Sequence, residues 1–306
     1  MRRAGLFLLL WMVMGLGVVS AHAAETVVLL LSERGGVYSQ FADSFVGAMG
    51  SGDLRQVRQV VLNNEQLEQA SDLQGASLVV AIGTAAAKVA AKQAAPVLYV
   101  MSPRSIVERF LDSGRRGRAS AIYLDQPVSR QLALVRQVLP GKSRVALLAG
   151  PEVRPYLSRV RAVGQRMGFE VVSEAIEDEA AVVPVLNRIL PHTDVLLALP
   201  DSLVYNRNSA RFVLLTTYRL QRPVIAFSQA YVTAGALAAV FSTPQQIARQ
   251  AAEMARSFSV NGVFPTPRYP SQFSVVVNRY VARSLSYDIP EDQVLYDELL
   301  RADTSE

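Results

Sequence analysis

Short apolar runs alternate with amphipathic segments along most of this chain, and this alternation constrains the fold more than any other feature. In the first part, apolar runs lie at 26–32, 57–63, 77–83 and 96–101, and a segment with helical spacing follows each one. A strand that is apolar along its whole length is buried on both faces, which is typical of a parallel sheet covered by helices on both sides. The pattern therefore predicts a doubly wound α/β unit.

The same pattern restarts after a Gly/Arg-rich loop at 112–120 and an extended piece at 121–125. Apolar runs follow at 144–150, 170–176, 194–200 and 223–229. Helical segments between and after them are predicted at 127–139, 153–167, 180–190 and 206–220. Because this second array is as long as the first, we expect α/β architecture with two doubly wound, Rossmann-like lobes.

The remainder of the chain is too short for a third domain. It contains two further predicted strands, at 235–242 and 271–278, a predicted helix at 243–258 and two short helical pieces near the end. We expect these segments to return to each lobe in turn and to form a multi-strand hinge. The N-terminal lobe would then comprise 24–120 plus 241–266, and the C-terminal lobe 121–240 plus 267–306.

The first residues have the pattern of a secretory signal peptide. Arg2 and Arg3 precede an apolar run at 4–19, and Ala21-His22-Ala23 is a small-residue cleavage site, so cleavage is expected after Ala23. A membrane anchor is the alternative, because the apolar run approaches spanning length. We expect cleavage, and hence a soluble periplasmic protein. The chain contains no cysteine, so a lipid anchor and disulfides are both excluded.

Composition argues against several other function classes. The formal charge of +5 is modest and scattered, which does not favour nucleic-acid binding. Beyond residue 23 the chain has one histidine, His192, and no cysteine, so neither a Cys/His zinc site nor an ordinary Ser-His-Asp triad is expected. No phosphate-binding or nucleophile-elbow motif is found there. We therefore expect neither an enzyme nor a cofactor.

Several segments, taken in order, resemble one known family. They are "AIGTAAAKVAAK", "QPVSRQLALVRQVLPGKSRVALLAGP", "TDVLLALPDSLVYN", "RPVIAFSQAYVTAGALAAVFSTPQQIARQAAEMA" and "SQFSVVVN". This order is similar to that of substrate-binding proteins of ABC transporters with the type I periplasmic binding protein fold, in an uncharacterised periplasmic-component branch. The resemblance covers about Val27 to Ile289. It implies two lobes joined by three crossings, a solute in the cleft, hinge closure and an ABC permease as partner, and we expect a monomer.

Three positions depart from the family pattern. Ala85 stands where relatives usually have proline after Gly-Thr, "SGRRGRAS" replaces a glycine- and asparagine-rich turn, and Gln229 replaces an acidic residue. These departures leave open an alternative from another class, a periplasmic sensor or regulatory binding protein without an importer. A carboxylate hydrolase using Glu33 and Asp201 is a further alternative. A DNA-binding repressor of this fold would need an N-terminal helix-turn-helix, and the export signal occupies that end.

Ligands of open parallel sheets bind beyond the carboxyl ends of the strands, and this rule selects candidate ligand-binding residues. In the N-terminal lobe they are Ser32, Glu33, Tyr38, Gly83, Thr84 and Ala85. Backbone N–H groups at the helix start after Gly83 are expected to bind a carboxylate or a carbonyl oxygen. Simple capping by Thr84 and an ordinary turn at Glu33 are the alternative interpretations.

In the C-terminal lobe the same rule and the resemblance point to a second group. Asp201 and Ser202 follow one strand, while Ser228, Gln229 and Tyr231 are expected to end another. Asp201 is expected to pair with an ammonium group, although a helix or turn cap is the alternative. Tyr123 and Tyr205 are further candidates for stacking or packing. Together the two groups suit an amino-acid-like zwitterion. Arg115, Arg116 and Arg118 form a basic loop, solvated or used for docking.

Overall fold

The computed structural model describes residues 26–50, 56–62, 73–111 and 117–303. The predicted signal peptide, the helical segment expected after 63 and two of the loop arginines, Arg115 and Arg116, lie outside these residues. No helix in the described part of the chain is long and apolar enough to cross a membrane.

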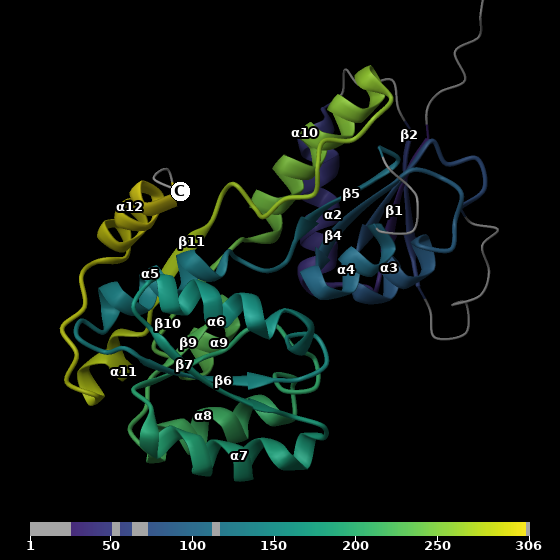
Figure 1. Ribbon diagram of the computed structural model, residues 1–306. Helices are drawn as coiled ribbons and strands as arrows, with labels where there is room; N and C mark the ends of the chain where they lie inside the picture. The colour runs from purple at the N-terminus through teal and green to yellow at the C-terminus, as the bar shows by residue number, and fades with distance from the viewer. Residues whose placement is uncertain (1–25, 51–55, 63–72, 112–116, 304–306) are drawn as a thin grey trace, which may run out of the picture.

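The first sheet contains five strands that are all parallel (Figure 1). Their spatial order is β2 (Gln56–Val61), β1 (Thr26–Leu31), β3 (Leu78–Ile82), β4 (Val97–Ser102) and β5 (Ala119–Tyr123). Three helices follow strands of this sheet in sequence: α2 (Gly36–Met49), α3 (Thr84–Ala90) and α4 (Arg104–Leu111). The apolar runs thus form parallel strands, as the sequence predicts.

The second sheet contains six strands. Their order is β11 (Ser274–Val277), β10 (Ala238–Phe241), β9 (Val224–Ala226), β8 (Val195–Leu197), β6 (Arg144–Ala149) and β7 (Glu170–Ala175). All neighbours are parallel except β10 and β11, which pair antiparallel. The helices are α5 (Val128–Val138), α6 (Leu157–Arg166), α7 (Val182–Ile189), α8 (Ser209–Arg219), α9 (Gln229–Ala234), α11 (Arg279–Ser284) and α12 (Asp292–Asp303).

Each sheet is buried on both faces, because alternate residues of a strand enter different cores. In β1, Leu29 and Leu31 pack with α2, while Val28 and Leu30 pack with residues of α3 and α4. In the second sheet, one core contains residues of α5, α6 and α12, and the other contains residues of α7, α8 and α9. The chain therefore has two Rossmann-like lobes, each with its own core on either side of a sheet.

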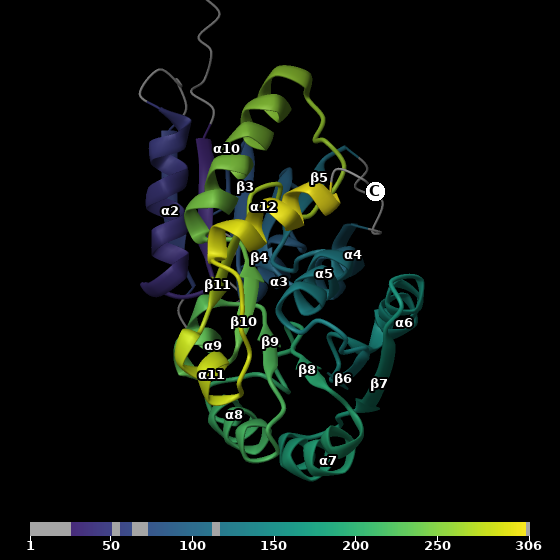
Figure 2. The same cartoon turned by 90° about the vertical axis from the view of Figure 1, so that its left-hand side faces the viewer.

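Helix α10 (Pro244–Asn261) follows the second-sheet strand β10 but packs against α2 in the first lobe (Figures 1 and 2). Its Ile247 and Ala251 share a core with Phe41 and Phe45 of α2. A capping box between Thr243 and Gln246 fixes its start, and Gly262 in the left-handed region ends it. The chain thus passes between the lobes after β5, after β10 and after α10.

Candidate functional site

The predicted residues of the first lobe come together where β1 and β3 end. The Ser32 hydroxyl donates to the Ile82 carbonyl at 2.9 Å and accepts from the Ala86 N–H at 3.0 Å, so it ties both strands to the start of α3. Gly83 has φ of 88°, and a Cβ there would lie 2.6 Å from the Ser32 Oγ and 2.7 Å from the Tyr38 ring. Ser32, Tyr38 and Gly83 therefore pack tightly against one another, and position 83 requires glycine.

The other first-lobe candidates are neighbours of these three residues in the sequence. Glu33 is exposed, and Thr84 and Ala85 are half-buried at the start of α3. Burial and, to a smaller extent, the Glu33 charge raise the pKa of Tyr38. Gly83, and not Thr84, is the N-cap of α3, and the side chain that accepts from the first turn of this helix is that of Ser32, through the Ala86 N–H. The capping interpretation of Thr84 is therefore wrong.

Asp201 has the hydrogen bonds of a cap, the alternative that the sequence analysis left open. Its side chain is only 2% exposed, and its oxygens accept hydrogen bonds from the backbone N–H groups of Glu152, Val153, Leu203 and Val204 at 2.9–3.3 Å. The carboxylate thus caps two loops that follow β6 and β8. The neighbouring Ser202 is exposed and donates from its hydroxyl to Glu152 at 2.7 Å.

The second-lobe aromatic candidates form a cluster. The centres of the Tyr205 and Tyr231 rings lie 6.1 Å apart, and the Phe227 ring packs against both. Burial raises the pKa of Tyr205 well above its ordinary value, and burial raises that of Tyr231 to about 12. In the described part of the chain neither buried hydroxyl has a hydrogen-bond partner. The cluster therefore offers two phenol groups near the carboxyl end of β9.

The local structure after β9 differs from the expectation. The strand ends at Ala226, and Gln229 and Tyr231 lie in helix α9, with Ser228 as its N-cap. A helix of six residues is too short to show a helical period next to an apolar run, so the sequence pattern extends the strand through it. Ser228 is half-buried and Gln229 is exposed.

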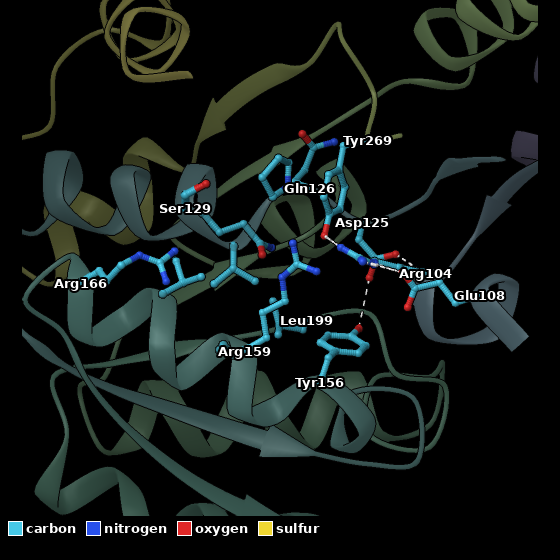
Figure 3. A pocket seen from close by; sticks show the side chains of 15 residues that line it. Arg104, Glu108, Asp125, Gln126, Ser129, Tyr156, Arg159, Arg166, Leu199 and Tyr269 are labelled. Carbon is cyan, nitrogen blue, oxygen red and sulfur yellow. Dashed lines mark hydrogen bonds and ion pairs between the residues drawn. The ribbon is translucent and has the colours of Figure 1, made fainter. Parts of the chain in front are cut away.

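A cavity of about 520 Å³, termed here the junction pocket, lies between the two lobes (Figure 3). Its walls come from α4 of the first lobe, α5 and α6 of the second, residue Leu199 after β8 and two connections between the lobes. Its polar lining residues include Arg104, Glu108, Asp125, Tyr156, Arg159 and Tyr269. None of the ligand-binding residues predicted from the sequence, all of which the structure describes, lines this cavity.

Arg104 organises the first-lobe side of the junction pocket. Its guanidinium donates to Glu108 at 2.5 Å and to the Tyr269 hydroxyl at 2.9 Å. It lies 5.4 Å from the centre of the Tyr123 ring, which itself packs edge-on against Tyr269. Tyr123 is the last residue of β5 and is buried, and burial raises its pKa to about 12. Tyr123 therefore packs against Arg104 and Tyr269, which line the pocket, without lining it itself.

Asp125 lies at the point where the chain first leaves the first lobe. Its carboxylate accepts from the Arg104 backbone N–H at 2.6 Å and from the Tyr156 hydroxyl of the second lobe at 3.3 Å (Figure 3). Burial raises the pKa of Asp125 to about 6, despite the hydrogen bonds, which lower it. Burial and the charge of Asp125 raise the pKa of Tyr156. One carboxylate thus connects a helix start in one lobe with a tyrosine in the other.

The strand-end rule was capable of finding part of this pocket. Arg104 follows β4 and Asp125 follows β5, so both lie at the edge from which the other candidates were selected. Tyr269 belongs to the connection between α10 and β11, far along the chain, and no local pattern places it beside Arg104. In the described residues no group of His, Asp or Glu side chains is arranged to hold a metal ion.

Comparisons with known proteins agree with this architecture. The family model described as ABC transporter substrate binding protein matches residues 52–297. The chain belongs to this family. A search of curated proteins gave no match.

Solved structures of low sequence identity share the fold of this family member. A substrate-binding protein with adhesive properties from Clostridium difficile, in a ligand-free open form, has a TM-score of 0.71 at 19% identity, covering 88% of this chain and 97% of its own. A Streptococcus pneumoniae protein in complex with L-Trp has a TM-score of 0.68 at 15% identity, covering 89% and 98%. A Burkholderia graminis solute-binding protein with D-arabinose has a TM-score of 0.53 at 14% identity, covering 83% and 95%.

Proposed function

We propose that this protein is the solute-binding component of an ABC importer, and that it binds a small polar or amino-acid-like solute between its lobes. The observation that carries the proposal is the junction pocket, whose walls come from both lobes and from two of the connections between them. A volume of about 520 Å³ suits a small molecule. A solute in contact with both lobes favours the closed arrangement, because it gains contacts that the open arrangement lacks.

The proposed lobes comprise 24–120 with 241–266, and 121–240 with 267–306. Family membership and the ligands of the related structures, an amino acid in one and a sugar in another, support a small solute. On closure we expect the strand-end residues of both lobes to approach the solute. These are Ser32, Glu33, Tyr38, Thr84 and Ala85 from the first lobe and Ser202, Tyr205, Ser228, Gln229 and Tyr231 from the second.

The remaining parts of the proposal concern export and partners. We propose that residues 1–23 direct export and are removed, and that the mature protein acts as a periplasmic monomer. The closed form is proposed to dock on an ABC permease in the inner membrane. A role without covalent chemistry agrees with the family, whose members bind solutes.

A thermal-shift screen tests solute binding. The mature protein is heated with amino acids, organic acids, peptides, sugars and nucleosides, each in turn. A ligand at one hundred times its Kd adds about 2.7 kcal/mol to the free energy of unfolding, which raises the Tm by roughly 5 °C or more. We expect one chemical class to produce such a shift. Absence of a shift with every class contradicts the proposal.

The importer role needs a second measurement, made with the solute identified by that screen. Uptake of the radiolabelled solute is compared between wild-type cells and cells lacking this gene. We expect uptake to fall by at least tenfold in the deletion strain and to return on complementation. Unchanged uptake, together with tight binding in vitro, identifies the protein as a sensor instead.

A further inference from the structure

Two arginines of helix α6 line the junction pocket in a regular pattern. Arg159, Val160, Val163 and Arg166 line it from one side of α6, which follows from their helical spacing. Arg159 and Arg166 are seven residues apart, or about 10 Å along the helix axis. Figure 3 shows Arg166 at the opposite end of the pocket from Arg104 and Glu108. The two arginines thus distribute positive charge along one wall.

These two arginines are exposed cations of the pocket that have no ion-pair partner in the described residues. Arg104 is paired with Glu108, and Asp125 is held by a backbone N–H and the Tyr156 hydroxyl. For Arg159 and Arg166, no hydrogen bond or ion pair is found within the described residues. The pocket therefore holds two guanidinium groups whose donors are available to an incoming anion, with which arginine forms planar, paired hydrogen bonds.

Gln131 supplies a second, independent observation. This α5 side chain lines the pocket and is only 1% exposed, yet its Oε1 atom has no hydrogen-bond partner in the described part of the chain. Buried polar atoms in native proteins are nearly always paired, so an unpaired one beside a cavity indicates a missing partner. A ligand hydroxyl or ammonium group becomes such a partner when the Gln131 side chain turns its Oε1 atom, an acceptor that is buried in this structure, toward the cavity.

The rest of the lining favours an organic ligand over an inorganic anion. Val128, Val160, Val163 and Leu199 contribute apolar surface, and Val160 and Leu199 are themselves buried in the protein. A hydrated phosphate ion gains nothing from apolar walls, whereas the carbon skeleton of a small acid loses contact with water there.

We propose that the junction pocket selects a small organic acid, whose carboxylate groups pair with Arg159 and Arg166 and whose hydroxyl or ammonium group donates to Gln131. Hydroxy and amino dicarboxylic acids have this combination of groups. A neutral sugar leaves both arginines unpaired. This inference rests on the proposed function, because it names the solute class for the same site.

Isothermal titration with defined probes tests the inference. The probes are L-malate, L-glutamate, succinate, inorganic phosphate and D-glucose, titrated into the wild type, Arg159→Gln and Arg166→Gln. Arg161→Gln is the matched control, because Arg161 lies on the same helix, is exposed, bonds to Ser173 at 2.6 Å and does not line the pocket. We expect malate or glutamate to bind, each pocket variant to weaken binding at least tenfold, and the control to stay within twofold.

Each remaining outcome decides against part of the inference. Binding of glucose with unchanged affinity in both pocket variants overturns the acid class and leaves the proposed function intact. Binding of phosphate alone overturns the organic ligand. Equal affinity for succinate and malate overturns the role of Gln131, and Gln131→Leu, which we expect to remove the preference for malate, checks this directly. Failure of all probes, and of every class in the thermal screen, contradicts the proposed function itself.

Discussion

The Asp201 carboxylate receives four backbone N–H groups, from residues 152, 153, 203 and 204, in a site with almost no access to water. Hydrogen bonds to a charged group each contribute about 1.5–3 kcal/mol, although contributions within one cluster are not additive. Gly150 lies so close that a Cβ there would be 2.2 Å from the carboxylate. The Asp201 carboxylate therefore fixes the loops after β6 and β8 relative to each other.

Replacement of Asp201 by alanine is expected to lower the free energy of unfolding by about 3 kcal/mol, because several backbone N–H groups lose their acceptor. Urea denaturation of the mature protein measures this. Ser202→Ala, at the exposed neighbouring position, serves as the control and is expected to change the free energy of unfolding by less than about 0.5 kcal/mol. If Asp201→Ala has the free energy of unfolding of the wild type but binds the solute much more weakly, the capping role of Asp201 is contradicted.

Single residues also show where sequence reasoning about the site stops. The strand-end rule placed Ser32, Gly83 and Tyr38 near one another, and the structure brings these three into contact. The rule gives the position of a residue along a strand but not the partner of its side chain, so it did not distinguish a cap at Asp201 from a ligand contact. The assignment of the predicted residues to a solute site stays a prediction.

At the scale of elements, strands were more predictable than short helices. An apolar run such as 26–31 has one stable position, inside a parallel sheet, and β1 forms there. Helix α9 follows β9 after a two-residue gap and is too short for its period to be visible. The antiparallel pairing of β11 with β10 depends on the path of the chain through α10, which a local pattern does not contain.

Helix α2 offers a prediction at this scale. Gly47 lies within the helix, is exposed and has open space where a Cβ would be placed. Gly47→Ala is expected to raise the free energy of unfolding by about 0.5–1 kcal/mol, because alanine restricts the unfolded chain and favours helix. Gly83→Ala should do the opposite, since its φ is positive and its Cβ would clash with Ser32. Urea denaturation compares the two; destabilisation by Gly47→Ala contradicts the argument.

At the scale of the whole molecule, the lobes are joined by three chain connections and by side chains at the junction. Asp125 belongs to this joint, because it accepts from Arg104 of the first lobe and from Tyr156 of the second. The two lobes and their βα order follow from the sequence pattern alone. The junction pocket does not, because it depends on how α4 and α6 of different lobes are placed.

Burial of Asp125 predicts a dependence of stability on pH. Its pKa rises from 3.8 to about 6 on folding, so between these values the native protein retains a proton that the unfolded chain releases. The stabilisation from this group is fully present below about pH 4 and is lost as the pH rises through about 6, by roughly 3 kcal/mol. The Asp125→Asn variant lacks this dependence on pH, because an asparagine side chain does not titrate.

Urea denaturation of the wild type and Asp125→Asn at several pH values between 4 and 7 measures this effect. The free energy of unfolding of the wild type, relative to that of the variant, is expected to decrease over this range. Groups common to both proteins cancel in the comparison. A constant difference from pH 4 to pH 7 shows that Asp125 is an ordinary solvated carboxyl group.

The return of α10 to the first lobe affects how the newly made polypeptide acquires its structure. Phe41 and Phe45 share their core with Ile247 and Ala251, so the opening third of the chain has no complete apolar interior until synthesis has passed roughly residue 255. During that interval the face of α2 that packs on α10 lacks its cover and is available to chaperones or to aggregation. Biogenesis must therefore protect this face of α2 until α10 has been added.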